Sequence, residues 1–303
     1  MTIALTGATG FMGRAALDEA QRREEPVRAL TRREQAPQDG VEWVRGTLDD
    51  TASLAEMCRG TDAVLHVAGL TTSNDAAEFE RANVTGTANV IEAMKQARVK
   101  RLVFVSSLSA REPRLSAYGA SKAVAETLVE KSGLDWTIVR PPGVYGPRDV
   151  DYFEMFRSAK WGVVPIPPRG ASSIIHVADL VRLLLDLVDA PPALVRKRIF
   201  EPDDGREGGW SHGELAEAIG AAVGRKVLAP KLPPGAMRAA AKIDRMVRGR
   251  NARLTEDRVG YMLHPNWVVR SSYKVPRAVW EPRIPGEDGL KQTAEWYRRE
   301  GWL

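Results

Sequence analysis

A tyrosine and a lysine four residues apart, Tyr118 and Lys122, are the pair in this chain whose types and spacing suggest chemistry. They lie in the stretch Y-G-A-S-K, where a helix would place both side chains on one face. A tyrosine hydroxyl has an ordinary pKa of about 10, too high for efficient proton exchange at neutral pH. An ammonium at about 4 Å, with an effective dielectric of about 20, would lower that pKa by roughly 3. The pair predicts a general acid or base, although the spacing alone is common in helices.

Two serines end a predicted strand upstream of this pair. The stretch L-V-F-V-S-S-L-S at 102–109 predicts a buried strand followed by the hydroxyls of Ser106 and Ser107. Ligands of open α/β sheets bind outside the carboxyl ends of the strands. A serine there could donate a hydrogen bond to a substrate carbonyl oxygen. The alternative is a serine that caps the following turn.

Three glycines, Gly7, Gly10 and Gly13, follow the first apolar run and precede a stretch compatible with a helix. Gly7 would allow a tight turn, Gly10 would let backbone N–H groups approach a pyrophosphate, and Gly13 would let the helix pack on the strand. The helix N-terminus would then face the anion. The spacing predicts a dinucleotide site, against the simpler interpretation of a Gly-rich turn.

Strands and helices alternate along the first two thirds of the chain. We predict strands at 2–5, 27–31, 41–45, 63–67, 102–106 and 136–140, and helices at 14–23, 53–58, 84–96 and 118–131. Such alternation indicates right-handed crossovers and a parallel sheet covered on both faces. We therefore expect an α/β fold of the Rossmann type, with a doubly wound parallel sheet.

The pattern changes near residue 150, where prolines interrupt the chain. Strands at 172–176 and 197–201 flank an apolar helix at 178–188, and the sequence beyond residue 203 is mostly helical. We predict a dinucleotide-binding domain at 1–150, to which 177–203 returns, and a smaller substrate lobe formed by 151–176 and 204–303. Four aromatic residues near the junction could wall an apolar pocket or belong to the core: Tyr145, Phe153, Phe156 and Trp161.

Composition argues against several classes of function. The net charge of +5 is modest against 44 Lys and Arg residues, so we expect no nucleic-acid partner. One cysteine, Cys58, allows no disulfide within the chain, and no metal-ligand spacing is present. The N-terminus does not resemble a signal peptide, and no apolar run approaches the roughly 20 residues that span a bilayer. We expect a cytoplasmic enzyme without a metal.

The segment 237–253 is strongly basic. Six cations and one acid lie in it: Arg238, Lys242, Arg245, Arg248, Arg250, Arg253 and Asp244. Such a segment can bind an acidic membrane surface or a substrate phosphate. The lack of large aromatic anchors favours the alternative, a solvated helix face, so we expect no membrane partner.

Together these motifs resemble the short-chain dehydrogenase/reductase superfamily, and its extended branch in particular. T-G-A-T-G-F-M-G is similar to the nucleotide motif TGxxGxxG of that family. Further similar segments follow in the order of the family: H-V-A-G at 66–69, N-V-T-G-T at 83–87, S-S at 106–107, Y-G-A-S-K, R-P-P-G-V-Y-G-P at 140–147 and I-I-H-V-A-D-L at 174–180. The resemblance covers nearly the whole chain.

The resemblance implies roles for these residues. Tyr118 would exchange a proton with the substrate oxygen, while Lys122 would lower its pKa and hold the nicotinamide ribose. Ser107 would polarise the carbonyl and Asn83 would support a proton relay through water. Ser107 is preferred because the serine of the family is usually the second of such a pair, but the strand register leaves Ser106 open. Cofactor contacts are implied at Gly7, Thr9, Gly10, Phe11, Met12, Gly13, Arg32, Arg33, Thr47, Leu48, Val67, Ala68, Gly69, Ser106, Tyr118, Lys122, Pro141, Gly143 and Val144.

The second predicted strand is followed by Arg32 and Arg33. An acidic residue at this position would bind the ribose 2′-hydroxyl of NAD, whereas an arginine suits the 2′-phosphate of NADP. We therefore expect NADP(H) in preference to NAD(H), unless both arginines only face solvent. Thr47 stands where the family often has an aspartate, which leaves the adenine contact less defined.

The extended branch also contains nucleotide-sugar epimerases and sugar dehydratases. Dehydratases usually carry an acidic pair where this chain has Leu108 and Ser109, and only ten residues, 108–117, separate Ser107 from Tyr118. We expect an oxidoreductase that acts on a small or moderately hydrophobic alcohol or carbonyl substrate. The alternatives are an epimerase, with diphosphate contacts from Arg206, Arg270 or the basic segment, and a non-catalytic NAD(P)-binding sensor or scaffold. Homodimers are common in the family.

Overall fold

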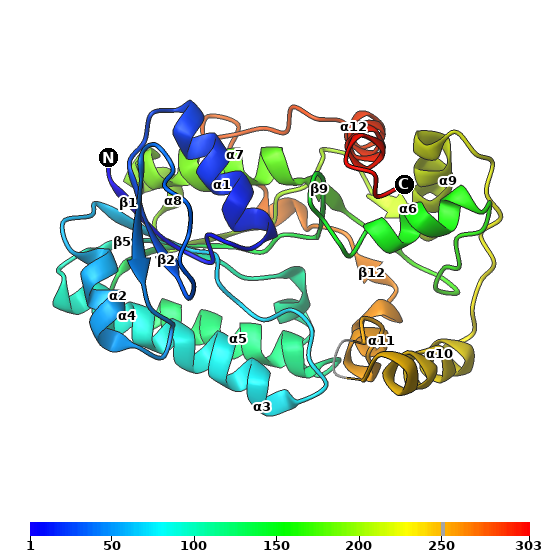
Figure 1. The fold of residues 1–303 in the computed structure, drawn as a ribbon, viewed down its shortest axis with the longest axis horizontal. Helices are drawn as coiled ribbons and strands as arrows, with labels where there is room; N and C mark the ends of the chain where they lie inside the picture. The colour runs from blue at the N-terminus through cyan, green and yellow to red at the C-terminus, as the bar shows by residue number, and fades with distance from the viewer. Residues whose placement is uncertain (250–251) are drawn as a thin grey trace.

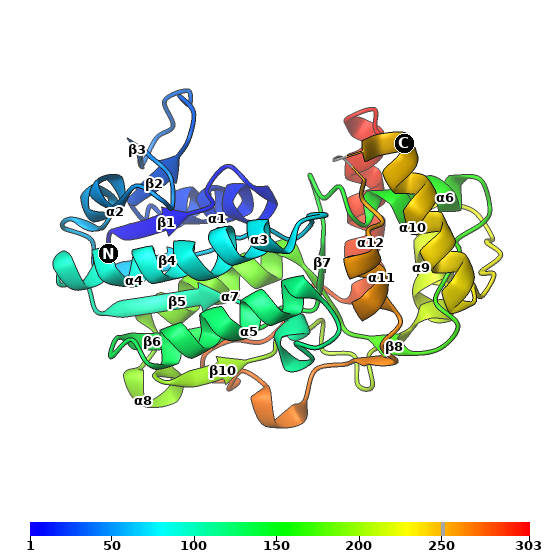
Figure 2. The ribbon, with the colours of Figure 1, turned by 90° about the horizontal axis from the view of Figure 1, so that it is seen from below.

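The core of the computed structural model, which describes residues 1–249 and 252–303, is a seven-stranded sheet. All neighbouring strands run parallel (Figure 2). Their spatial order is β10 (Arg198–Phe200), β6 (Asp135–Val139), β5 (Arg101–Val105), β4 (Ala63–His66), β1 (Ile3–Thr6), β2 (Val27–Thr31) and β3 (Val41–Arg45). The strand order reverses between β1 and β4, which is where ligands of doubly wound sheets bind. The predicted α/β fold is confirmed.

Helices cover both faces of the sheet (Figure 1). On one face α1 (Phe11–Arg22) packs against α7 (Val177–Asp189), and α8 (Pro192–Val195) adds to the same hydrophobic cluster. The other face is covered by α2 (Thr51–Cys58), α4 (Gly86–Gln96) and α5 (Ala117–Glu130). The central strands between them are therefore mostly apolar, and every residue of β1, β4 and β5 is buried.

The helix before β5 begins earlier than the predicted 84–96. It starts with α3 (Ala76–Phe79), continues through a π-helical segment at Glu80–Thr85 and ends as α4. π-helical turns are rare and frequently occur at functional sites. This one carries Asn83.

The second lobe has a hydrophobic cluster of its own. This cluster joins α6 (Phe153–Lys160), α9 (His212–Val223) and α12 (Gly286–Arg299). Two small sheets lie beside it, one of β7 (Gly143–Tyr145) with β9 (Ile174–His176), the other of β11 (Trp210–Ser211), β8 (Ala171–Ser172) and β12 (Asn266–Trp267). A smaller cluster holds α10 (Pro234–Arg248) against α11 (Glu256–Met262). The division at residue 150 into two domains stays a prediction.

The four aromatic residues at the junction differ in their surroundings. Tyr145 and Phe156 are fully buried in the core of the second lobe. The ring of Phe153 packs edge-on against Tyr297, at 5.1 Å between centroids. Trp161 is 82% exposed. The core alternative therefore holds for Tyr145 and Phe156, Phe153 packs half-buried against the same core, and Trp161 faces solvent.

Two features of the chain bear on membranes. Within 1–249 and 252–303, none of the helices combines the length and the apolar character that crossing a bilayer requires. The basic segment 237–253 includes α10, but Arg250 lies outside the described residues.

Candidate active site

The loop after β1 forms a cradle beside β4. Gly7 has a φ of +76°, and a Cβ there would lie 2.7 Å from the backbone nitrogen of Ala68. A Cβ on Gly13 would overlap the carbonyl of Gly7. Only glycine therefore lets α1 pack this closely on the turn. The predicted roles of these two glycines agree with this geometry.

The N-terminus of α1 opens into this cradle. Gly10 caps the helix without a side-chain hydrogen bond, and Phe11 and Met12 are half-buried in its first turn. Thr9 and Gly10 are exposed, and no acidic residue lies in the first turn. Free N–H groups and the helix dipole attract an anion. The segment Val67, Ala68 and Gly69 follows β4 across the same switch point, so the cradle fits the pyrophosphate of a dinucleotide.

The predicted adenosine contacts lie along the same edge of the sheet. Arg32 and Arg33 are exposed directly after β2, in a turn where the Thr31 hydroxyl donates to the Arg33 carbonyl at 2.7 Å. Thr47 is exposed after β3, and its hydroxyl accepts from the backbone of the next turn. The side chain of Leu48 packs against Gly86 of α4.

Lys122 is buried on the second turn of α5. Its ammonium donates a hydrogen bond to the carbonyl oxygen of Val105 at 2.7 Å and lies 4.5 Å from the ring centroid of Phe104. Burial lowers the pKa of Lys122 to about 8, and the carboxylate of Glu126 opposes that change. The side chain is thus held at the carboxyl end of β5.

Tyr118 lies on the first turn of α5, whose N-cap Ser116 accepts from the backbone of Gly119. Burial raises the pKa of Tyr118 to about 12, and a hydrogen bond with the Ser107 side chain acts against the rise. The predicted lowering of this pKa by Lys122 is therefore wrong for this structure. The reason is that the ammonium bonds to the strand end rather than to the phenol, and burial dominates.

The two serines at the end of β5 have different surroundings. Ser106 is buried, and its hydroxyl donates to the carboxylate of Glu126. Ser107 is half-buried, and its hydroxyl donates to the Ser109 hydroxyl at 3.1 Å and accepts from the backbone of the following 3-10 turn at Leu108–Arg111. Its side chain also acts to lower the pKa of Tyr118. The geometry places Ser107, rather than Ser106, beside the tyrosine.

Buried ion pairs hold this strand end in place. Arg140 donates two hydrogen bonds to Glu126, at 2.9 and 2.6 Å. Glu201 lies 3.6 Å from Arg140 and accepts from Arg111 at 3.2 Å. The network joins α5, β6 and the end of β10. The sequence motifs did not single out Glu126 or Glu201. The residues around a carboxylate do not indicate which distant arginine it will pair with in the folded chain.

The π-helical segment directs Asn83 into the same region. Its side chain bonds to both the N–H and the carbonyl of Leu70, at 2.7 and 3.0 Å, and donates to the Ser121 hydroxyl at 2.9 Å. A Cβ on Gly69 would lie 3.1 Å from the Asn83 oxygen and 3.7 Å from the Lys122 ammonium nitrogen. Asn83, Gly69 and Lys122 therefore converge beside the cradle.

The predicted nicotinamide segment crosses the same edge. The carbonyl of Pro141 accepts from the backbone of Leu108 at 3.0 Å, so the segment lies against the serine turn. A Cβ on Gly143 would overlap the hydroxyl of Tyr152. Val144 is half-buried on β7.

Sequence reasoning missed the aromatic surroundings of Tyr118. Its ring lies 5.9 Å from that of Phe79 and 6.4 Å from that of Tyr261, between centroids. Arg258, on the same helix as Tyr261, pairs with Asp151 at 2.9 Å. No motif marks these positions, because they come from α3 and α11, which are distant in sequence from Tyr118.

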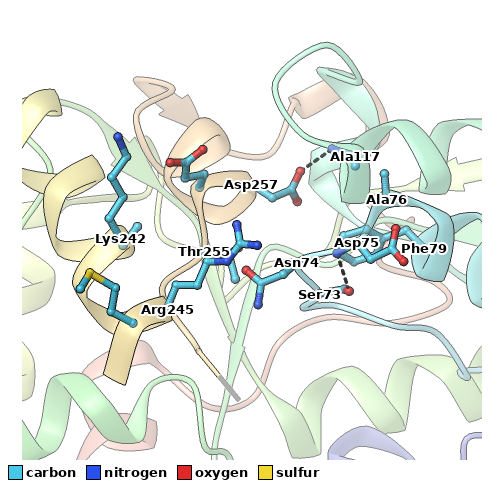
Figure 3. Close-up of a pocket in the computed structure, with 13 residues that line it drawn as sticks. Ser73, Asn74, Asp75, Ala76, Phe79, Ala117, Lys242, Arg245, Thr255 and Asp257 are labelled. Atoms are coloured by element: carbon cyan, nitrogen blue, oxygen red, sulfur yellow. Dashed lines mark hydrogen bonds between the residues drawn. The ribbon is translucent and has the colours of Figure 1, made fainter. Parts of the chain in front are cut away.

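A cavity of about 710 Å³ opens beside this aromatic group (Figure 3). It is bounded by α3, the start of α5, α10 and α11, and Phe79 and Ala117 belong to its wall. Asp257 accepts a hydrogen bond from the N–H of Ala117, and Arg245 extends across the cavity toward Asn74. Phe79 packs on the ring of Tyr118 and Ala117 precedes it in the chain, so two residues of the cavity wall contact or adjoin the tyrosine, which is not itself part of the wall.

A doubly wound sheet with a glycine cradle and a Ser-Tyr-Lys group at its carboxyl edge defines an NAD(P)-binding enzyme. A family model described as NAD(P)H-binding matches residues 7–188. The chain belongs to this family and to the extended short-chain dehydrogenases/reductases, as the sequence motifs predicted.

Relatives with assigned activities cover much or all of the chain. It is 32% identical to a ceramide reductase of Caulobacter vibrioides, over 99% of this chain and 96% of the relative. It is 35% identical to the 4-hydroxy-2-methyl-3-oxo-4-farnesyl-3,4-dihydroquinoline-1-oxide ketoreductase of Stigmatella aurantiaca, over 62% of this chain and 64% of the relative. The fold matches that of the UDP-glucose 4-epimerase of Thermus thermophilus in complex with NAD, with a TM-score of 0.71 and 22% identity over 98% and 99% of the two chains.

Proposed function

We propose that this enzyme is an NADP(H)-dependent reductase that converts a ketone on an apolar, lipid-like molecule into an alcohol. The observation that carries the proposal is the position of Tyr118. Tyr118 lies one helical turn from Lys122, and the Ser107 side chain acts on its pKa. Its ring lies 5.9 Å from that of Phe79, which lines the cavity. These contacts support a role for Tyr118 as the group that passes a proton to a substrate in the cavity.

Tyr118 is the proton donor in this proposal. Its phenol keeps its proton at neutral pH, because its pKa is about 12. It can therefore give the proton to the ketone oxygen as negative charge develops there. The bound cofactor supplies the hydride. Ser107 donates a second hydrogen bond to the same oxygen and stabilises the developing charge.

Lys122 and Asn83 act behind the tyrosine. The ammonium of Lys122 lies close to Gly69, where it would hold the nicotinamide ribose. Asn83 is tied to Leu70 and Ser121, so we assign it a positioning role that also supports a proton relay. The glycine cradle would hold the pyrophosphate, while Arg32 and Arg33 would pair with the 2′-phosphate of NADP(H).

The substrate class is supported by the cavity and by the names of two relatives. The cavity wall includes the apolar side chains of Phe79, Ala241 and Met246, and Phe79 packs against the ring of Tyr118. One relative is named for a ceramide and the other for a farnesyl compound, both of which carry long apolar chains. We therefore extend the sequence expectation, a small or moderately hydrophobic carbonyl compound, to ketones with an apolar chain.

A nucleotide-sugar epimerase has less support. Arg206, one of the residues considered for diphosphate contacts, stacks on Trp210 at 4.0 Å and pairs with Glu214 and Glu287 at 2.7 and 3.1 Å. Its charge is already matched within the lobe. An epimerase would interconvert UDP-sugars without added cofactor, and this assay separates the two functions.

The reductase is tested with a series of ketones of increasing alkyl chain length, presented in detergent micelles, by following NADPH oxidation. We expect kcat/KM to rise with chain length while the cavity fills. Turnover of short ketones alone would overturn the lipid-like substrate, and absence of NADPH oxidation across the series would overturn the reductase.

A further inference from the structure

The most exposed apolar side chains on any one helix of the described chain lie on α10. Ile243 is 60% exposed, Met246 85% and Val247 78%. The opposite face of α10 is anchored, because Met237 and Ala241 are buried against α11. The helix thus has one face in the protein and a second apolar face in solvent. Exposed apolar patches of this kind mark interaction sites.

Of the exposed cations of α10, Arg238 and Lys242 lie nearer this apolar face, whereas Arg245 extends across the cavity toward Asn74. Arg238, Lys242 and Arg245 are all exposed along α10. The single acid of the helix, Asp244, is turned inward, where its carboxylate accepts from the backbone N–H groups of Arg253 and Leu254, at 2.8 and 2.9 Å. The outward surface of α10 therefore combines apolar and positive side chains without an acidic one.

We propose that α10 docks this enzyme on the surface of an anionic lipid bilayer. Helices of this composition lie in the membrane interface, with apolar side chains among the acyl chains and cations beside the headgroups. Each Lys or Arg near an anionic surface strengthens binding by about 1 kcal/mol, which is roughly five-fold. The inference goes beyond the proposed function, because it rests on the side chains of α10. It would remain valid if the enzyme acted on a substrate of another class.

A second copy of the chain is a poorer occupant of this face. Symmetric dimers pair the same patch on both subunits. Joining two α10 faces would bring Arg238, Lys242 and Arg245 of each copy close to the same cations of the other. Anionic headgroups instead match both the charge and the apolar stripe.

Docking through α10 would also place the cavity near the bilayer. Lys242 and Arg245 belong both to α10 and to the wall of the cavity (Figure 3), and so does Met246. Figure 1 shows α10 beside α11 at the outer edge of the second lobe. A lipid leaving the membrane surface would therefore have a short path to Tyr118.

The test is flotation of the purified full chain with vesicles, without substrate or cofactor. We expect binding to vesicles of phosphatidylcholine with phosphatidylglycerol, little binding to phosphatidylcholine alone, and release as salt is raised. Failure to bind the anionic vesicles would overturn the proposal. The reductase assay in micelles is independent, so either idea can fail without the other.

Two pairs of variants locate the binding surface. The first variant, Ile243→Ser with Val247→Ser, removes two apolar side chains from α10. Its control is Val124→Ser, because the side chain of Val124 on α5 is also exposed, at 46%. We expect the double variant to bind at least ten-fold more weakly and the control to bind like the wild type. Each variant is first required to keep the wild-type melting temperature. Equal loss in both would show that the apolar face of α10 is not the site.

The charge variants make the second pair. Lys242→Gln with Arg245→Gln removes two cations of α10, and Arg298→Gln with Arg299→Gln removes two exposed cations of α12. We expect the α10 pair to weaken binding on the order of thirty-fold and the α12 pair to have little effect. Equal effects would mean attraction to net charge alone. The wild type could instead form a dimer and fail to bind vesicles. If Ile243→Ser with Val247→Ser then dissociated that dimer, the apolar face of α10 would belong to a second copy of the chain.

Discussion

The ammonium nitrogen of Lys122 lies 2.7 Å from the carbonyl oxygen of Val105, the last residue of β5. The contact joins the second turn of α5 to the carboxyl edge of the sheet. It also explains why helical spacing alone misjudged the pKa of Tyr118. The ammonium donates its hydrogen bond to the end of β5 and not to the phenol of Tyr118. Lys122 therefore lies beside the cofactor cradle, near Gly69.

The pKa of Lys122 gives a prediction for the pH dependence of ketone reduction. It is lowered to about 8, so the ammonium carries its charge below that pH and loses it above. We expect kcat/KM to be level below pH 8 and to fall about ten-fold per pH unit above it. Tyr118, with a pKa of about 12, keeps its proton over this range. The measurement is a pH profile of NADPH oxidation.

Lys122→Arg is the control for this assignment. Arginine stays charged, so the decline should move to higher pH, even if kcat is lower throughout. An identical decline near pH 8 in wild type and Lys122→Arg would exclude Lys122 as its source.

The cofactor preference depends on Arg32 and Arg33. We expect wild type to bind NADPH at least ten-fold more tightly than NADH in calorimetric titrations, because charge-assisted hydrogen bonds contribute roughly 1.5–3 kcal/mol. Arg32→Ser with Arg33→Ser should weaken NADPH binding to the level of NADH and leave NADH unaffected. Equal affinity of wild type for both cofactors would show that the arginines do not recognise a phosphate.

The buried pair of Glu126 and Arg140 should matter for stability. Removing one partner of such a pair leaves an uncompensated buried charge. We expect Glu126→Gln to lower the free energy of unfolding by roughly 3 kcal/mol in urea titrations. Glu130→Gln, at an exposed site one turn further along α5, is the matched control and should change little. Equal stabilities of the two variants would contradict a structural role for Glu126.

Much of the fold was predictable because periodic apolar runs mark buried strands. The predicted strands at 27–31 and 41–45 coincide with β2 and β3. The helix predicted at 84–96 begins earlier, because α3 and the π-helical segment extend it toward the N-terminus. A π-helical turn produces no regular spacing of apolar residues from which it could be predicted.

The parts of the site that are local in sequence were predictable, and those that depend on distant contacts were not. The glycines and the Y-G-A-S-K stretch carry their own spacing. The raised pKa of Tyr118 depends on burial, to which Phe79 and Tyr261 from other elements contribute. Likewise, the sequence of α10 shows its charge, but only packing against α11 decides that Ile243 and Val247 face solvent.

Single-turnover reduction of a long-chain ketone by Tyr118→Phe tests the central proposal most directly, because it isolates proton donation from binding. Phenylalanine keeps the ring packing against Phe79 and removes only the hydroxyl. We predict that, at saturating NADPH, the rate falls on the order of 10²–10⁴-fold, while the melting temperature stays at its wild-type value. An unchanged rate of reduction in Tyr118→Phe would contradict the role of Tyr118 as proton donor.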